Sequence, residues 1–301
     1  MITANELRKS YGDTVAVDGA SFEVFEGEIF GMVGPNGAGK TTIIECLEGL
    51  RLPDSGRIRV LGLDPSKDRY ELCERIGVQL QSAALPERIK VGEALELFAS
   101  FYRRSVDWRL LLERMGMGEK SGAFVSELSG GQRQRVFIAL ALVNDPDLVF
   151  MDELTTGLDP QSRRSMWDMV RDVRERGKTV VLTTHFMEEA ERLCDRVAVV
   201  DQGRVVALDT VGNLISSLGA ENRVVFSVDG RPDLAGITAV PGVVRAEQIG
   251  DRVIISVRGS GIIGRVTTAL EEDGVGFRDL RVEKPTLEDV FLSLTGKEIR
   301  E

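Results

Sequence analysis

The residues with the clearest chemical potential lie in a glycine-rich run at positions 34–42. They are Gly34, Pro35, Asn36, Gly37, Ala38, Gly39, Lys40, Thr41 and Thr42. The run fits the pattern G-x-x-x-x-G-K-[ST] of a phosphate-binding loop, in which glycines let successive backbone N–H groups turn inward around an anion. Lys40 would reach the β- and γ-phosphates of a nucleotide, and the Thr41 hydroxyl would hold Mg²⁺. We therefore predict the binding of a nucleoside triphosphate.

The segments on either side of this loop are those that the motif requires. Residues 29–33 form a continuous apolar run typical of a buried strand. Residues 41–50 place Ile43, Ile44, Leu47 and Leu50 at helical spacing. The N-terminus of such a helix adds a partial positive charge beside the phosphates. The order strand, loop, helix disfavours the alternative, a glycine-rich turn with a chance lysine.

A pair of carboxylates follows a second apolar run. Residues 147–151 read Asp-Leu-Val-Phe-Met and lead into Asp152 and Glu153. A continuous apolar run fits a central parallel strand, and the carboxyl ends of such strands are where α/β sheets bind ligands. We expect Asp152 to hold Mg²⁺, directly or through water, and Glu153 to orient or deprotonate the attacking water. Without a phosphate loop, the same pair would indicate only an acidic turn.

The one histidine of the chain, His185, follows a third apolar run, at residues 179–184. It therefore belongs to the same sheet edge as Glu153. We favour a role at the γ-phosphate over the commoner alternative of a surface or structurally satisfied histidine.

A second helix start carries glycines. Residues 128–132 read Leu-Ser-Gly-Gly-Gln and open a predicted helix over 132–143. Ser129 is a suitable N-cap, and the glycines expose backbone amides, so this start is a second candidate anion site. The alternative is a cap with no ligand.

Composition limits the function classes. The chain has 301 residues, 43% of them hydrophobic, which suits one large domain or two smaller ones. A net charge of −10 argues against a primary nucleic-acid role. Three cysteines, odd in number and far apart, indicate neither a metal site nor a disulfide framework, so we expect a reducing cytoplasm. We expect no signal segment, and no apolar stretch approaches the roughly 18 residues of a membrane span.

The remaining patterns indicate two domains. Residues 2–33 suggest a small antiparallel sheet that leads into the buried strand. A mostly helical insertion follows at about 82–127, or 82–145 with the helix after residue 128, and it is the natural surface for coupling to another protein. A helix at 211–218 closes the first domain, 1–218. Residues 221–301 suggest a small α+β extension with strands at 223–228, 243–249, 252–257 and 277–282 and helices at 262–272 and from Thr286.

In this order, the motifs resemble those of the ATP-binding subunits of ABC transporters. The residues that carry the resemblance are Tyr11, 34–42, Gln81, 128–132, Asp152, Glu153, 157–159 and His185. The tail at 284–291 resembles the C-terminal extension of export-type subunits, including multidrug and antibiotic-efflux proteins of the daunorubicin-resistance type. The resemblance implies an α/β P-loop NTPase (ABC ATPase) core with an antiparallel β subdomain and a helical subdomain, followed by a small α+β C-terminal domain.

The resemblance also implies where ATP would lie. Two domains would face head to tail around two ATP molecules. Residues 34–42 of one domain would bind each nucleotide, with Tyr11 stacked on adenine. Ser129, Gly131 and Gln132 of the other domain would approach the γ-phosphate. His185 would contact the same phosphate.

Further roles follow from the same resemblance. Gln81 would sense the metal and the water and link the site to a membrane partner. Gln79 competes for that role, but the family pattern places the glutamine at the strand end, which favours Gln81. Asp159 would contact the opposite domain. Leu154 departs from the family, which usually has proline there, and this substitution could alter the turn towards Asp159.

The leading expectation is an ATPase subunit that powers export of drug-like, antibiotic or lipid-like compounds through a separate membrane permease, at the inner face of the cell membrane. A homodimer is expected, with a heterodimer left open. A non-transport ABC ATPase acting on a soluble partner is the alternative. A third hypothesis gives the C-terminal extension a ligand-sensing role, although we favour a dimerisation or docking surface.

Overall fold

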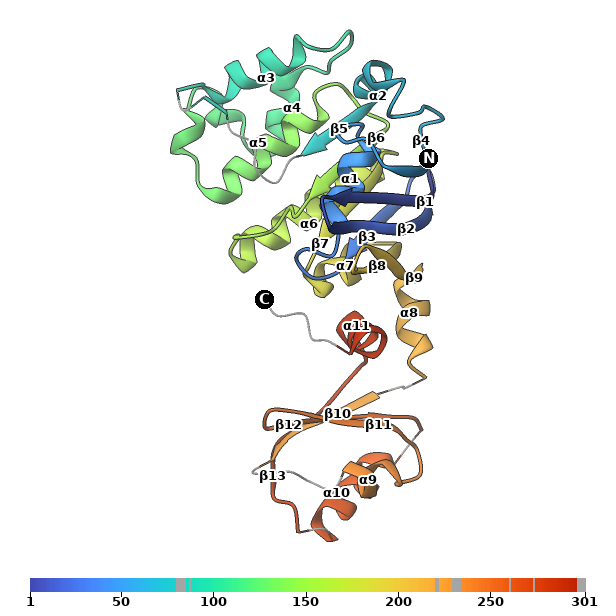
Figure 1. Cartoon of the computed structure of the whole chain (residues 1–301). Coiled ribbons are helices and arrows are strands. Elements are labelled where there is room, and N and C mark those ends of the chain that lie inside the picture. Colours follow the sequence, from blue (N-terminus) through green and yellow to red (C-terminus); the bar gives the residue numbers. More distant parts are fainter. Residues whose placement is uncertain are drawn as a thin grey trace. The chain divides into compact units, whose positions relative to one another are not determined.

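The structure is a computed structural model that describes residues 1–79, 85–86, 88–219, 222–228, 234–259, 261–272 and 274–296. It divides into two compact units, Met1–Val211 and Gly212–Glu298 (Figure 1). The boundary between the units falls at the start of helix α8 (Val211–Ser217), whereas the predicted first domain, 1–218, includes this helix.

The first unit is built on a six-stranded sheet in the order β5-β6-β7-β3-β8-β9. The strands are β3 (Ile29–Val33), β5 (Ile76–Gln79), β6 (Leu148–Asp152), β7 (Thr179–Thr184), β8 (Arg196–Asp201) and β9 (Arg204–Thr210). All pairs are parallel except β8 with β9. Every residue of β3, β6 and β7 is buried, which fits a parallel sheet covered on both faces. The predicted α/β class is confirmed.

A smaller antiparallel sheet packs against the central one. Its order is β2-β1-β4, with β1 (Ile2–Tyr11), β2 (Thr14–Val24) and β4 (Ser55–Val60). Buried side chains from both sheets and from helix α1 (Lys40–Leu47) form one hydrophobic cluster, which includes Leu7, Phe30 and Leu47. The shared cluster fixes the start of α1 against the end of β3.

Helix α1 is shorter than predicted. The helical spacing of apolar residues continues to Leu50, but the helix ends at Leu47. Gly49 has a φ of 72°, a left-handed conformation that terminates helices. Leu50, which the periodicity assigns to the buried face, is half exposed.

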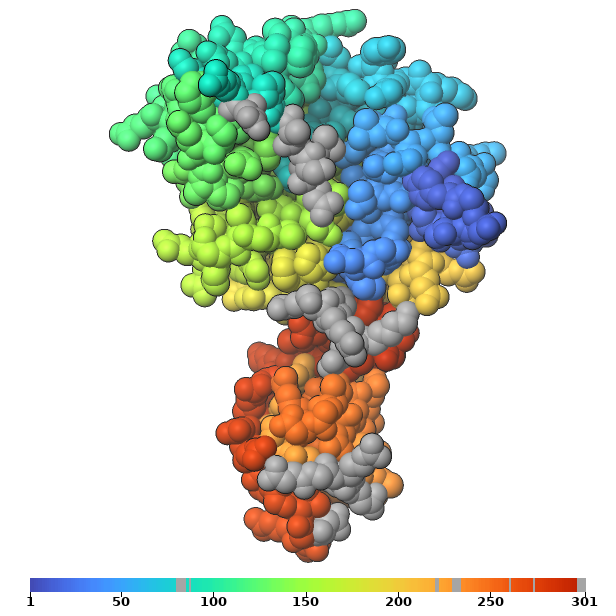
Figure 2. Space-filling view, turned by 60° about the vertical axis from the view of Figure 1, so that its left-hand side comes forward, coloured from blue at the N-terminus to red at the C-terminus, as the bar shows by residue number. Residues whose placement is uncertain are grey.

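Helices α2 (Arg69–Arg75), α3 (Val91–Ala99), α4 (Trp108–Arg114) and α5 (Gly130–Leu142) make up the helical part of the first unit. Figure 2 shows the cyan and green residues that contain α3, α4 and α5 gathered at one end of it. Helices α6 (Pro160–Glu175) and α7 (Met187–Leu193) pack together and against β7. Within the described ranges, no helix is long and apolar enough to cross a membrane.

The second unit has the element order βαββαβ after α8. Its elements are β10 (Asn222–Val228), α9 (Leu234–Thr238), β11 (Val243–Ile249), β12 (Arg252–Val257), α10 (Ile262–Glu272), β13 (Phe277–Glu283) and α11 (Leu287–Thr295). The antiparallel sheet has the order β11-β12-β10-β13, and α9 and α10 share a hydrophobic cluster with one of its faces. Helix α9 was not predicted.

A buried ion pair fastens α11 to this sheet. Arg223 of β10, only 7% exposed, donates from Nη1 to the carboxylate of Asp289 on α11. Its Nη2 lies 3.3 Å from Glu283 of β13. Asp289 also accepts from the backbone N of Thr286 at 2.7 Å and so completes the capping box of the helix. These contacts explain why the tail carries Thr286 and Asp289 at this spacing.

Candidate active site

Side chains from three neighbouring strands meet at the carboxyl edge of the central sheet. Lys40 follows β3, Asp152 and Glu153 lie at the end of β6, and His185 follows β7. The sheet order β6-β7-β3 makes these strands adjacent, although more than a hundred residues of sequence separate β3 from β6 and β7. The edge is the one where parallel α/β sheets bind ligands.

The phosphate-binding loop needs glycine at two close backbone approaches. A Cβ at Gly34 would lie 2.1 Å from the carbonyl oxygen of Val200, and a Cβ at Gly39 would lie 2.3 Å from that of Ala16. Both residues also have positive φ angles, of 156° and 103°. A side chain at either position would therefore displace the loop from β8 or β2.

Lys40 crosses the mouth of the loop. Its Nζ donates to the carbonyl oxygens of Gly34 at 2.7 Å and Pro35 at 3.0 Å. Burial lowers the pKa of Lys40, whereas the charges of Glu153 and Asp152 raise it. A buried ammonium held only by carbonyls and nearby carboxylates is well suited to exchange these contacts for phosphate oxygens.

The Asp152 carboxylate is shared by two threonines. Its Oδ2 accepts from Thr41 Oγ1 at 3.3 Å, and its Oδ1 accepts from the hydroxyl of Thr183. Burial raises the pKa of Asp152, and the Thr183 hydrogen bond lowers it. Thr41 and Asp152 thus present two hard oxygen donors close together, which suits Mg²⁺ with water or phosphate as further ligands. No group of three or more His, Cys, Asp or Glu residues placed to hold a metal occurs among the described residues.

Glu153 lies in a strained, well-supported turn. Its φ is 48°, and its backbone N lies 3.1 Å from both the carbonyl oxygen and the Oγ1 of Thr183. Its carboxylate is 3.6 Å from His185 Nδ1, and the two side chains are only 11% and 13% exposed. His185 Nδ1 has no hydrogen-bond partner in the described part of the chain. The pair can therefore receive a polar group between or beside them, such as water or a phosphate oxygen.

The turn after Glu153 accommodates its unusual leucine. Leu154 is 2% exposed and packs inside the unit. The turn continues to Asp159, whose carboxylate caps α6 by accepting from the backbone N of Gln161 at 3.0 Å and of Ser162 at 2.9 Å. Hydrogen bonding from Ser162 holds the pKa of Asp159 below its usual value.

The residues at 129–132 do not meet the phosphate loop of the same chain. Ser129 caps α5: its Oγ accepts from the backbone N of Gln132 at 3.3 Å, and its own N donates to Gln132 Oε1 at 3.1 Å. The N-cap prediction is confirmed, and the helix begins at Gly130, two residues earlier than predicted. Figure 1 shows α5 grouped with α3 and α4, whereas α1 lies beside the sheets.

The remaining predicted residues are Tyr11 and the two candidate glutamines, Gln79 and Gln81. Tyr11 ends β1 with a ring that is 41% exposed, and the Arg51 guanidinium lies 5.0 Å from its centroid. Gln79 is buried at the end of β5. The predicted strand continues to Gln81, which lies outside the described residues.

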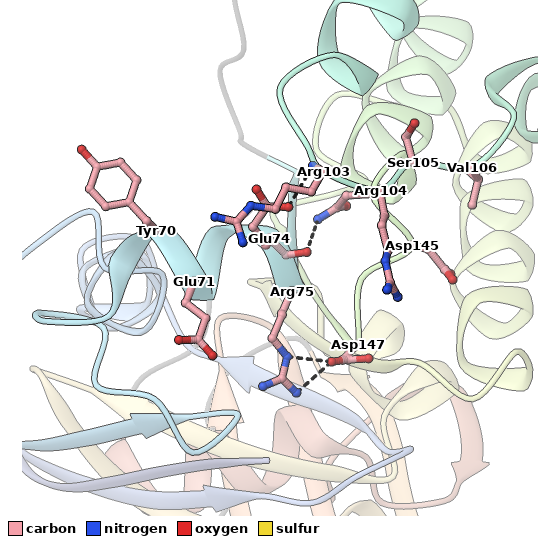
Figure 3. Close-up of a pocket in the computed structure, with 11 residues that line it drawn as sticks. Tyr70, Glu71, Glu74, Arg75, Arg103, Arg104, Ser105, Val106, Asp145 and Asp147 are labelled. Carbon is pink, nitrogen blue, oxygen red and sulfur yellow. Dashed lines mark hydrogen bonds and ion pairs between the residues drawn. The ribbon is translucent and has the colours of Figure 1, made fainter.

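Sequence reasoning missed a groove of about 1460 Å³ beside the helical region. Figure 3 shows α2 on one side, with Tyr70, Glu71 and Glu74, and the segment with Arg103 and Arg104 on the other. At its base, Arg75 donates to Asp147 Oδ2 at 2.9 Å. No sequence signal identified α2, because only Leu72 of this helix is buried.

The sheet order, the glycine loop and the carboxylates after β6 define a phosphate-loop nucleotide-binding protein. Comparison with known proteins then gives the family. Residues 17–156 match the family model described as ABC transporter. The chain is 38% identical over 308 residues to the daunorubicin resistance ATP-binding protein DrrA3 of Streptomyces coeruleorubidus, covering 99% of this chain and 97% of that protein.

A second relative and a solved structure support the same family. The chain is 42% identical over 307 residues to the Nod factor export ATP-binding protein I of Paraburkholderia xenovorans (strain LB400), covering 100% of this chain and 98% of that protein. The solved dimeric structure of a bacterial ABC transporter cassette is 28% identical, with a TM-score of 0.64, and covers 70% of this chain and 98% of its own. The chain belongs to the ABC transporter family, as an ATP-binding subunit that hydrolyses ATP.

Proposed function

We propose that the chain powers export through a separate membrane permease and works at the inner face of the cell membrane. The supporting observation is the convergence of Lys40, Asp152, Glu153 and His185 at one sheet edge. Full-length similarity to proteins named for daunorubicin resistance and Nod factor export favours export over import. Drug-like, antibiotic or lipid-like compounds are the proposed cargo class.

Each residue at this edge has a proposed role in ATP hydrolysis. The loop amides at 34–42 and Lys40 bind the phosphates, and Tyr11, which is partly exposed, stacks on adenine. Thr41 and Asp152 would hold Mg²⁺, which would supply charge stabilisation for the phosphates, and Gln81 has the proposed role of sensing the metal and the water. Glu153 orients or deprotonates the attacking water, and His185 binds the γ-phosphate.

We propose that a second copy of the chain completes the site. Within one chain Ser129 and Gln132 hydrogen-bond to each other, and the neighbour of Gly131 is Ser162 on α6, so we infer that these residues contact no nucleotide bound by their own chain. In a head-to-tail dimer they would face the γ-phosphate bound by the partner and exclude water from it. The dimeric arrangement of the similar cassette supports this proposal. The exposed Asp159 would lie at the same contact.

We further propose that the permease contacts the groove beside α2. The groove adjoins the helical insertion and carries both signs of charge, from Glu71 and Glu74 on one wall and Arg103 and Arg104 on the other. A partner helix with charges of both signs would match these walls.

Replacement of Glu153 tests the assigned chemistry. We expect Glu153→Gln to reduce ATP turnover by about 10³-fold while ATP binding persists, because the amide keeps the shape but cannot accept the proton of water. The matched control is Glu175→Gln, an exposed position at the end of α6. Unchanged turnover in Glu153→Gln would refute the assignment of the base.

Capture of the partner tests the transport role. The tagged full-length chain is used to pull down proteins from detergent-solubilised host membranes, and mass spectrometry identifies them. We expect a multi-spanning membrane protein, which charge reversal at Arg103 and Arg104 together should weaken. Recovery of only soluble proteins across several detergents would favour the non-transport ATPase.

A further inference from the structure

A buried carboxylate on α7, Glu189, lies outside the set of residues assigned above. It is 1% exposed, and its Oε1 accepts a hydrogen bond of 3.0 Å from the indole Nε1 of Trp167 on α6. The hydroxyls of Thr184 and Thr155 and the charge of Arg163 act on the same carboxyl group. The Thr155 hydroxyl is buried, acts on the pKa of Glu189 and makes no hydrogen bond within the described ranges.

These neighbours come from the three segments that carry the proposed site residues. Thr184 is the last residue of β7 and immediately precedes His185. Thr155 lies two residues after Glu153, in the turn that leads to Asp159. Trp167 belongs to α6, the helix that Asp159 caps. One carboxyl group therefore lies where the catalytic turn, the end of β7 and α6 meet.

A second contact joins the same segments. The guanidinium of Arg163, on α6, lies 4.3 Å from the ring centroid of Phe186. That ring is 4.1 Å from the imidazole of His185. The backbone N of Phe186 donates to Thr184 Oγ1 at 2.9 Å, so the hydroxyl of Thr184 keeps its proton for another acceptor such as Glu189. The position of His185 thus depends on contacts with α6 as well as with β7.

The chemistry of Glu189 argues against a role in packing alone. Burial raises the pKa of this carboxyl, while the nearby hydroxyls of Thr184 and Thr155, the indole of Trp167 and the charge of Arg163 lower it. A buried carboxyl is costly unless it is hydrogen-bonded, and an apolar side chain of similar size often packs at least as stably. What a carboxyl adds is directional acceptance from several donors at once.

We propose that Glu189 is a positioning residue for ATP hydrolysis, which holds the segments bearing Glu153, His185 and Asp159 in one arrangement through Thr155, Thr184 and Trp167. The inference rests on the roles that the proposed function gives to Glu153 and His185. Misplacement of a reacting group by about 1 Å can reduce a rate by about 10²-fold. Small loosening of this junction should therefore lower kcat without loss of the fold.

The first test replaces the carboxylate by its isosteric amide. In Glu189→Gln, Trp167 keeps an acceptor, but an NH₂ donor replaces the second carboxylate oxygen, and the negative charge near Arg163 is lost. We expect kcat to fall about 10- to 100-fold, with KM for ATP within about threefold of the parent. The control is Glu188→Gln, an adjacent exposed residue whose ion pair is with Arg192. Equal kcat values in the two variants would overturn the proposal, as would a loss of kcat that matches the loss of folded protein.

The second test asks whether Glu189 acts through the site. Single-turnover rates are measured for Glu189→Gln, His185→Ala and the double variant. If Glu189 acts by placing His185, its substitution should change the rate by less than about threefold once His185 is absent. Independent, multiplying effects would show that Glu189 does not act through His185 and would overturn that part of the proposal. Trp167→Phe, which removes one donor and keeps the packing, should reproduce a smaller part of the kcat loss.

The outcome for Glu153→Gln separates this inference from the proposed function. If Glu153→Gln turns over like the parent, the base assignment fails and this inference fails with it. If Glu153→Gln is inactive while Glu189→Gln behaves like Glu188→Gln, only the positioning role is refuted.

Discussion

The ion pair between Arg223 and Asp289 should dominate the stability of the second unit. Their side chains are only 9% and 11% exposed, and loss of one partner from a buried pair costs about 3–5 kcal/mol because the other charge stays buried. Glu283 remains 3.3 Å from Arg223, so we expect the lower end of the range, about 3 kcal/mol, for Asp289→Asn. The amide oxygen can still cap Thr286, which isolates the effect of charge.

Calorimetry of the full chain measures this prediction. A loss of about 1 kcal/mol lowers Tm by about 4–8 °C in a unit of this size, so the transition of the second unit should fall by roughly 12–24 °C. Hydrogen exchange at residues 222–228 and 252–257 assigns the transition to that unit. The control is Glu288→Gln, the exposed neighbour on α11. If Asp289→Asn lowers Tm no more than Glu288→Gln, the ion pair is not what fastens α11.

Three further predictions follow from side chains of the first unit. Lys40→Met removes the ammonium at the loop mouth and should weaken ATP binding about 10- to 100-fold in isothermal titration, with the secondary structure unchanged. Native protein at pH 7 should react with maleimide at the exposed Cys73 alone, because burial raises the pKa of Cys46 to about 11 and that of Cys194 well above its usual value. After denaturation all three cysteines should react, and mass spectrometry counts the modified residues. Burial also raises the pKa of Glu48 from 4.5 to about 8, so the folded protein retains a proton that the unfolded chain releases. The free energy of unfolding should therefore fall as pH rises between these two values. Urea unfolding in EDTA at pH 5 and pH 8 should show a smaller fall in this free energy for Glu48→Gln than for the parent.

Local signals were sufficient for much of the fold. The glycine loop, the apolar runs of β3, β6 and β7 and the cap at Ser129 each depend on neighbours within about ten residues, and the sequence predicts them well. The order of the strands does not follow from such signals. Nothing local shows that β3 lies between β7 and β8, because pairing across some 150 residues is decided by how the whole apolar surface is covered.

The errors and omissions have physical causes of the same kind. Helix α1 stops early because Gly49 takes a left-handed conformation, which a periodicity count ignores. Helix α2 has one buried residue and α9 only five residues, so neither produces an apolar period. In the candidate site, the motifs identify Lys40, Asp152 and Glu153. The junction at Glu189 is a product of packing between α6, α7 and β7, and its residues are individually ordinary.

The position of β3 also governs when the nucleotide site can form during synthesis. Both neighbours of β3 come late, β7 ending at Thr184 and β8 at Asp201, so the strand before the phosphate loop emerges long before any partner strand. At ribosomal rates of about 5–20 residues per second, the synthesis of β8 is completed roughly 10–30 s after that of the apolar segment 29–33. Nucleotide cannot stabilise the nascent chain in that interval, because the loop has no framework to hold it. Until about two-thirds of the chain has been made, the strands available to cover this apolar segment are therefore those of the antiparallel sheet, β1, β2 and β4.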